Sequence, residues 1–196
     1  MDYYKIVRRG DDGRLWPAHG GTGEWVPDVD RVVSGDLTAC RNAIHFCAVD
    51  ELVYWASVGT EVWEFSPVVG KAHADENKHY AAGGRITRCV GRVTDATFHP
   101  IQAFYNAAVC QARDARNVAA RRVHDAAVCQ ARDARNVAAR SQDEKASDAN
   151  IRRAWETCDD ATRQCQKDYE AAVRRAGEEY GLALVRQLTE NEFYKR

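Results

Sequence analysis

Apolar residues recur at steps of three or four through the C-terminal half of the chain, the spacing that places them on one face of an α-helix. A first stripe contains Ile101, Tyr105, Ala108, Ala112, Ala115, Ala119, Val123, Ala127, Ala131, Ala134 and Ala138. A second stripe contains Ile151, Trp155, Cys158, Thr162, Cys165, Tyr169, Ala172, Ala176, Tyr180, Leu184 and Leu188. Pro100 suits the first position of a helix, where its missing N–H has no intrahelical partner. The stripes predict two long helices, because no glycine interrupts residues 92–176.

The N-terminal half has a different pattern, in which short β-branched and aromatic stretches alternate with glycine-rich connections. Four stretches have the composition of strands: residues 3–7, 44–46, 62–65 and 85–93. Asp50 can cap a short helix over residues 50–56. The core is expected to contain Trp16, Trp25, Trp55 and Trp63, because aromatic side chains bury a large area. We therefore predict an α+β fold, with a small mixed α+β domain at residues 1–98 and a long α-helical hairpin or coiled coil at residues 99–196.

A tandem duplication lies inside the first helical stripe. Residues 107–121 (AAVCQARDARNVAAR) recur unchanged at residues 126–140, a displacement of 19 residues. A solvent-facing helical arm absorbs such an insertion by growing about 28 Å longer, whereas a catalytic cleft or a close-packed core does not. Because 19 residues make five turns and one further residue, the second copy is rotated by about 100°. We expect looser packing or a local kink there.

Charge favours a hairpin over one continuous rod. Residues 100–140 carry seven arginines and three aspartates, a net charge of +4, whereas residues 141–170 carry eight acids and five bases, a net charge of −3. Successive helices of opposite charge favour antiparallel pairing. Ser141 or Ser147 can open the second helix. The residues expected to form interfaces are Ile101, Tyr105, Val123, Ile151, Trp155, Tyr169, Tyr180, Leu184 and Leu188.

The overall composition argues against two classes of partner. The net charge of −1 gives no general attraction to nucleic acid, and the arginines of the repeat are interleaved with aspartates, as on a solvated helix face. No apolar run approaches the roughly 20 residues that span a bilayer, and the N-terminus lacks the apolar segment of a secretion signal. We expect a cytosolic protein, or part of a particle that is assembled in a cytosol. The seven cysteines are an odd number, which indicates mainly reduced thiols.

One group of residues in the N-terminal half has the chemistry of a metal site. Cys40, His45 and Cys47 can bind zinc, with Cys89 or His79 as a fourth ligand. The spacing lacks the two-residue knuckle of zinc sites, so buried thiols beside a hydrogen-bonded histidine are the preferred interpretation. A nucleophilic pair of His45 and Cys47 would need an orienting group and an oxyanion site, and the sequence identifies neither. We predict no bound metal.

The N-terminal half contains a series of short motifs: Tyr4-Lys5, Gly23-Glu24-Trp25, Cys40 to Cys47, Leu52, Tyr54-Trp55, Val62-Trp63-Glu64 and the basic strand Arg85 to Arg92. In these motifs the chain resembles an uncharacterised family of bacteriophage and actinobacterial proteins, and we expect a protein of the host cytoplasm or of a virion. Members of that family carry such a small domain, followed by a tail rich in alanine and arginine. The resemblance implies a phage or mobile-element origin, and it implies no particular activity.

A shorter likeness is to ADP-ribosyltransferases. The segment Ile44-His45-Phe46-Cys47, followed by a helix with Tyr54, is similar to the part of those enzymes that lines the nicotinamide pocket. This likeness implies that Tyr54 stacks on the nicotinamide ring of NAD and that Glu64 is the catalytic carboxylate, with His45 beside them.

We predict a non-enzymatic structural or interaction protein that assembles through its helical arm, by self-association or by docking on a larger protein assembly. The duplication and the lack of a complete catalytic set favour this function. The alternatives are an NAD-using enzyme similar to ADP-ribosyltransferases, and a binding module stabilised by zinc.

Overall fold

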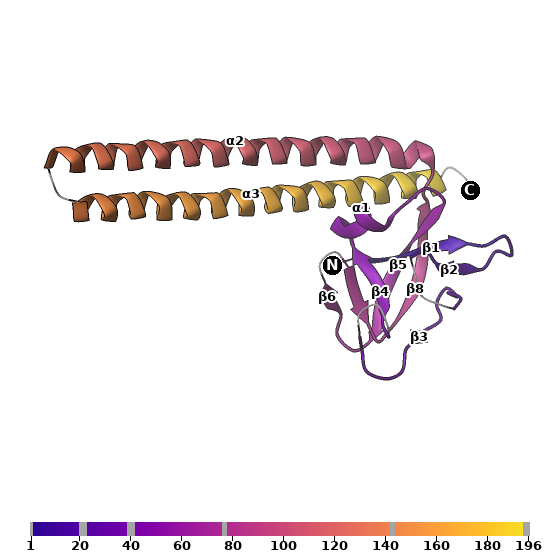
Figure 1. The fold of residues 1–196 in the computed structure, drawn as a ribbon. Helices are drawn as coiled ribbons and strands as arrows, with labels where there is room; N and C mark the ends of the chain where they lie inside the picture. The colour runs from indigo at the N-terminus through magenta and orange to yellow at the C-terminus, as the bar shows by residue number, and fades with distance from the viewer. Residues whose placement is uncertain (1, 20–22, 39–41, 76–77, 142–143, 194–196) are drawn as a thin grey trace. The chain divides into compact units, whose positions relative to one another are not determined.

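The computed structural model describes residues 2–19, 23–38, 42–75, 78–141 and 144–193. Strands occupy the N-terminal half and two long helices follow (Figure 1). The predicted α+β class is therefore confirmed. By internal contacts the chain forms two compact units: a sheet unit of Met1–Asn106 and Arg175–Arg196, and a helical unit of Ala107–Arg174. The predicted division at residue 98 follows the change in secondary structure, whereas the compact units place the ends of both helices with the sheet.

The sheet unit contains an antiparallel sheet whose order is β3-β8-β5-β1-β4-β7-β6, and β2 also pairs with β1. The strands are β1 (Tyr3–Arg9), β2 (Leu15–Pro17), β3 (Arg31–Val32), β4 (Ile44–Ala48), β5 (Thr60–Val69), β6 (His73–Asp75), β7 (Lys78–Ala81) and β8 (Gly83–Arg92). All four predicted strands are present, in β1, β4, β5 and β8.

Both faces of this sheet are covered. Side chains alternate between the faces along each strand, so Tyr4 and Ile6 of β1 lie in one hydrophobic cluster and Val7 lies in another. The first cluster also contains Val62, Val90, Ile101, Tyr180, Leu184 and Leu188. The second contains Leu15, Trp25, Ile44, Phe46, Trp63, Phe65 and Ile86. The ends of the two long helices thus complete the core on one face of the sheet.

The predicted tryptophan core is only partly correct. Trp25 and Trp63 are buried, and Trp55 packs against the first cluster. Trp16, however, is 38% exposed. It lies on β2, a three-residue strand paired only over its short length with β1. Such a short strand leaves one face of its aromatic side chain in solvent.

Two predicted helix starts are wrong. A 3₁₀ helix (Val49–Glu51) leads into α1 (Leu52–Trp55). The N-cap residue is Ala48, not Asp50, and the Ala48 N–H donates to Glu51 Oε2 (2.7 Å). The helix α2 begins at Asp95 and contains Pro100 in its interior. Thr94 and Thr97 cap it reciprocally, since Thr94 N–H donates to Thr97 Oγ1 (3.0 Å) and Thr97 N–H donates to Thr94 Oγ1 (3.4 Å).

The helical unit is an antiparallel hairpin formed by residues 107–141 of α2 (Asp95–Ser141) and residues 144–174 of α3 (Glu144–Phe193). The two helices run side by side (Figure 1). Arg116 lies over the ring of Tyr169, 4.8 Å from its centroid, and the rings of His124 and Trp155 are 5.9 Å apart. Ser141 is the last residue of α2 and does not open α3. The hairpin is thus the arrangement that the structure adopts, in place of a continuous rod.

The duplicated segments lie in one uninterrupted helix, and the expected kink is absent from α2 over its described length, Asp95–Ser141. Ala108 and Ala112 of the first copy are half-buried, and their equivalents Ala127 and Ala131 in the second copy are buried. The one-residue excess over five turns rotates the second copy, so that Ala127 and Ala131 become buried whereas Val128, the equivalent of half-buried Val109, becomes exposed. Alanine is small enough to fit at either edge.

Candidate functional site

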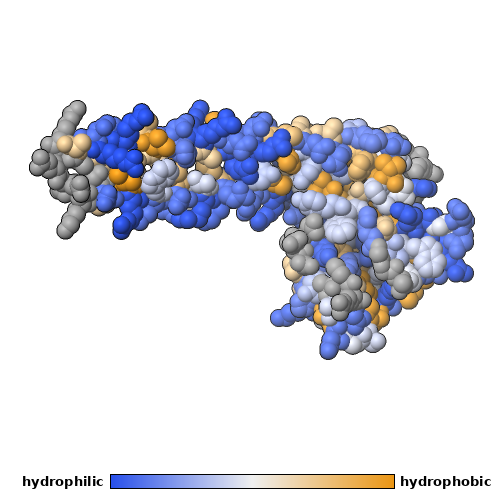
Figure 2. Space-filling view, in the orientation of Figure 1, coloured by the Kyte–Doolittle hydropathy of each residue, from blue (hydrophilic) through white to orange (hydrophobic). Residues whose placement is uncertain are grey.

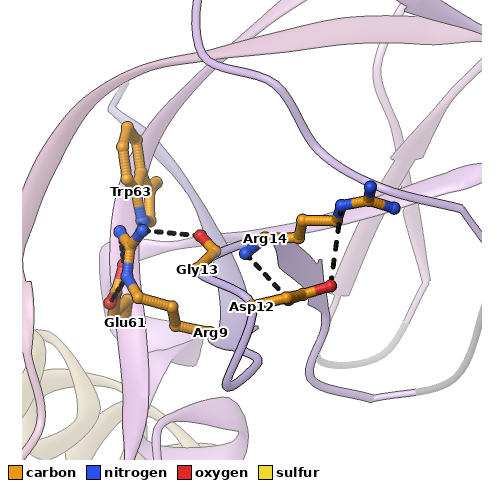
Figure 3. Close-up of polar contacts among 6 residues, drawn as sticks. All are labelled: Arg9, Asp12, Gly13, Arg14, Glu61 and Trp63. Carbon is orange, nitrogen blue, oxygen red and sulfur yellow. Dashed lines mark hydrogen bonds and ion pairs between the residues drawn. The ribbon is translucent and has the colours of Figure 1, made fainter.

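A buried carboxylate forms the centre of a polar network on the sheet (Figure 3). Arg9 donates to Glu61 through Nε (2.7 Å) and Nη2 (2.9 Å), and Trp63 Nε1 donates to Glu61 Oε2 (3.0 Å). Burial alone would raise the pKa of Glu61, but the hydrogen bonds from Arg9 and Trp63 outweigh it and lower this pKa. Glu61 is therefore held charged and fully hydrogen-bonded, which suits an anchor better than a general acid.

The same arginine reaches the turn between β1 and β2. Arg9 Nη1 donates to the carbonyl oxygen of Gly13 (2.9 Å), and Arg14 N–H donates to Asp12 Oδ1 (3.1 Å). Figure 3 shows that Arg9 connects the turn to Glu61 on β5. Asp12 and Arg14 are exposed. The network therefore joins the edge of the sheet to its centre and presents its outer part to solvent.

Lys5 is a buried ammonium group on the second face of the sheet. Its Nζ donates to the carbonyl oxygen of His45 and lies 5.3 Å from the ring centroid of Trp25. The Arg31 guanidinium lies 5.1 Å from the same ring. Burial and, to a smaller extent, the positive charge of Arg31 together lower the pKa of Lys5 to about 8. The Trp25 ring thus interacts with two cations, Lys5 and Arg31, through cation–π contacts.

A second buried carboxylate, that of Glu51, lies at the end of the 3₁₀ helix. His79 Nδ1–H donates to Glu51 Oε2 (2.9 Å), the oxygen that also accepts the Ala48 N–H. The His79 ring contacts Tyr3 and Phe46, with centroid distances of 5.1 and 5.8 Å. This pair connects β7 to the turn that follows β4. It is enclosed by aromatic side chains and serves the fold.

The residues of the ADP-ribosyltransferase likeness lie on three different elements. His45 is on β4 and its ring is 6.4 Å from that of Tyr80. Tyr54 is on α1 and is 50% exposed. Glu64 is on β5, where it forms an ion pair with Arg88. The contacts described for two of them are with other side chains, His45 with Tyr80 and Glu64 with Arg88.

The zinc set is likewise not assembled among the described residues. Cys40 lies outside them. Cys47 is buried, and its Sγ–H donates to the carbonyl oxygen of Tyr4 (3.5 Å). Burial raises the pKa of the Cys47 thiol, so this thiol is protonated at neutral pH and is a poor nucleophile and ligand. Within the described residues, no group of three or more histidine, cysteine, aspartate or glutamate side chains is arranged to hold a metal ion.

The residues expected to form interfaces fall into two sets. One set belongs to the core of the sheet unit: Ile101, Tyr105, Tyr180, Leu184 and Leu188. The other set lies in the helical unit, where Val123, Ile151 and Tyr169 are half-buried between the helices and Trp155 is 40% exposed. Most of this predicted interface is therefore used inside the chain.

The outward surface of α2 carries apolar residues that the periodicity analysis did not single out. Val118 and Val128 are 50% and 39% exposed. A shallow groove of about 700 Å³ lies beside Val118, lined by Gln111, Asp114, Ala115, Val118, Ala119 and Arg122. A second groove is lined by Gln130, Asp133 and Ala134, the duplicates of the first three, together with residues of α3. The repeat thus places the same side chains in two grooves.

The chain matches no known protein family, no curated protein and no solved structure. Within the described residues, no helix has the length and apolar character needed to cross a membrane. The function must therefore be argued from the chain's own residues.

Proposed function

We propose that this is a non-enzymatic structural or interaction protein that assembles through its helical unit, either with itself or within a larger protein assembly. A phage origin and a location in the host cytoplasm or in a virion are part of the proposal. The observation that carries it is the exposure of apolar side chains on α2: Val118 and Val128 on its outward surface, and Val137 on another side of the helix, are each more than one third exposed. Exposed apolar side chains along a helix favour contact with another protein.

The surface of the helical unit has the mixed character of a protein interface. In Figure 2 this part of the chain is mostly hydrophilic and carries separate hydrophobic patches. Arg121 and Arg132 alternate along the helix with Asp114 and Asp125. A nucleic-acid surface would instead present a continuous run of positive charge to the phosphates. The alternation favours a protein partner.

The polar groups of the sheet unit support the non-enzymatic part of the proposal. Glu51, Glu61 and Glu64 each pair with a basic side chain, respectively His79, Arg9 and Arg88. Cys47, the buried thiol, is protonated. General acid-base and nucleophilic catalysis need groups whose pKa matches their task. These side chains stabilise the fold. We therefore place the function in the contact surfaces of the protein.

The experiment compares two triple variants of the full chain by light scattering over a range of protein concentrations. The first replaces Val118, Val128 and Val137 with serine, a residue of similar helix propensity. The matched control replaces three exposed valines of the sheet unit, Val26, Val29 and Val58, with serine. The natural chain and the control are expected to form assemblies, whereas the first variant is expected to lose them with unchanged circular dichroism. A natural chain that stays monomeric, and that brings down no partner, would overturn the proposal.

A further inference from the structure

An exposed heptad pattern runs along the side of α2 that faces away from α3. We call it the outer seam. It consists of Ala107, Gln111, Asp114, Val118, Arg121, Asp125, Val128, Arg132, Arg135 and Ala139. The steps between these residues alternate between four and three, and all ten residues are exposed. This spacing is that of the contact line between two supercoiled helices.

The outer seam is symmetric about Val123, a half-buried residue of the inner stripe. Counting outward from residue 123, each seam residue has a counterpart at the same distance on the other side. The pairs are Ala107 with Ala139, Gln111 with Arg135, Asp114 with Arg132, Val118 with Val128, and Arg121 with Asp125. Three of the five pairs are complementary, because two of them join an acid to a base and one joins valine to valine; the other two join glutamine to arginine and alanine to alanine.

From this symmetry, and resting on the proposed function, we infer that the outer seam binds a second copy of this chain. The two α2 helices run antiparallel about a twofold axis that passes opposite Val123. In this arrangement Asp114 faces the partner's Arg132, and Val118 faces the partner's Val128. A two-fold interface contains each of these contacts twice.

Charge selects the direction and the register of the pair. A parallel arrangement would place Asp114 against a second Asp114, and Arg121 against a second Arg121. Like charges in direct opposition disfavour a pairing, so the seam rejects the parallel dimer and favours the antiparallel one. The groove beside Val118 contributes to the fit, since Ala115 and Ala119 leave room for an apolar side chain of the partner.

Both copies of the duplicated segment are needed for the seam. Asp114 and Val118 lie in the first copy, whereas Val128 and Arg132 lie in the second. A single copy lacks this symmetry. The first-copy equivalents of Val128 and Arg132 are Val109 and Arg113, and neither of these residues belongs to the outer seam. The duplication therefore created the self-complementary surface.

A charge-swap series tests the inference by sedimentation equilibrium at low ionic strength. Asp114→Arg places arginine against the partner's Arg132 at two sites, and Arg132→Asp places aspartate against the partner's Asp114. Each single variant is expected to weaken the dimer roughly tenfold. The double variant Asp114→Arg/Arg132→Asp restores opposite charges and is expected to recover dimerisation. Asp159→Arg, the same charge change on exposed α3, is the matched control and leaves dimerisation unchanged.

Disulfide trapping gives a second measurement. In a background with Cys110→Ser and Cys129→Ser, chains with Val118→Cys are mixed with chains with Val128→Cys. The mixture is expected to form a cross-link between residues 118 and 128. Either variant alone is expected to form no cross-link. In a dimer of one variant, the cysteine of one chain and the same cysteine of the partner are offset by ten residues along the helices, about 15 Å.

The possible outcomes separate this inference from the proposed function. A cross-link formed by Val118→Cys alone indicates a parallel dimer and overturns the inference. An assembled protein that shows neither the mixed cross-link nor the charge-swap rescue also overturns it, but leaves assembly through the helical unit standing. A natural chain that is monomeric at every concentration, with no partner, overturns both.

Discussion

Gly181 of α3 lies against the main-chain carbonyl oxygen of Val49, so closely that a Cβ atom at residue 181 would be 1.8 Å from that oxygen. Gly177, one turn earlier, has the same relationship with the Asp50 carbonyl oxygen, at 2.7 Å. The two glycines lie on one face of the helix and allow its backbone to approach the turn before α1. They fix how α3 packs in the sheet unit.

Gly181→Ala is therefore expected to destabilise the protein, although alanine is the better helix former. The added methyl group must displace either the helix or the Val49 turn, which costs about 1–3 kcal/mol as in other overpacked cores. Urea denaturation monitored by tryptophan fluorescence measures the change. Leu182→Ala, at the adjacent exposed position, is the control and is expected to change stability by less than about 0.5 kcal/mol. Equal stability of the two variants would show that the close contact does not matter.

Lys5 is expected to make stability rise with pH in the alkaline range. Its folded pKa of about 8 lies below the unfolded value of about 10.4, so the unfolded chain binds more protons between these pH values. The free energy of unfolding should therefore increase from pH 8 toward pH 10 by up to about 3 kcal/mol, relative to Lys5→Met. Urea denaturation of both proteins at each pH measures the difference. A constant difference between them would contradict the prediction.

Glu61 is also expected to make stability rise with pH, but in the acid range. Its folded pKa is lowered, so its contribution to stability is complete above the unfolded pKa of about 4.3 and is lost as pH falls through the folded pKa. Glu61→Gln should lower the free energy of unfolding at neutral pH by about 1.5–3 kcal/mol and should flatten its decline in acid. Glu64→Gln, at a more exposed ion pair, is the control, with an expected loss below about 1 kcal/mol.

The cysteines are expected to react with a thiol reagent in a fixed order. Cys110 and Cys129 are exposed, whereas Cys47 and Cys158 are buried and burial raises the pKa of Cys47. Brief alkylation of the native protein, followed by peptide mass spectrometry, should find the label on residues 110 and 129 first. In concentrated guanidinium chloride all seven cysteines should react. Early labelling of Cys47 in the native protein would show that the core of the sheet unit opens easily.

The helices were predictable because their signal is local. A period of 3.6 residues appears within any two turns, and it correctly identified buried Ile101, Tyr180 and Leu188. The periodicity gave a wrong prediction where a step of three and a step of four fit the stripe equally well, so that either of two neighbouring residues could be the buried one. Ala154 is buried and Trp155, beside it, is 40% exposed against His124. The smaller side chain takes the place between the closely packed helices.

The sheet and its buried charges were only partly predictable. Strand composition identified β1 and β5, but strand order depends on pairing between distant residues, such as Arg31 with Gly84. Because both faces of the sheet are covered, the Tyr3–Val7 stretch does not alternate between apolar and polar residues. This hid the inward orientation of Lys5. The only sequence signal for it was a charged residue inside an otherwise apolar strand.

The two long helices are nearly equal, at 47 residues for α2 and 50 for α3, yet only α2 contains the duplicated segment. Without its 19 additional residues α2 would have 28, and about 28 Å of α3 would have no neighbouring helix. The duplicated residues thus bring α2 to nearly the length of α3, so that the tip of the hairpin has two helices in place of one.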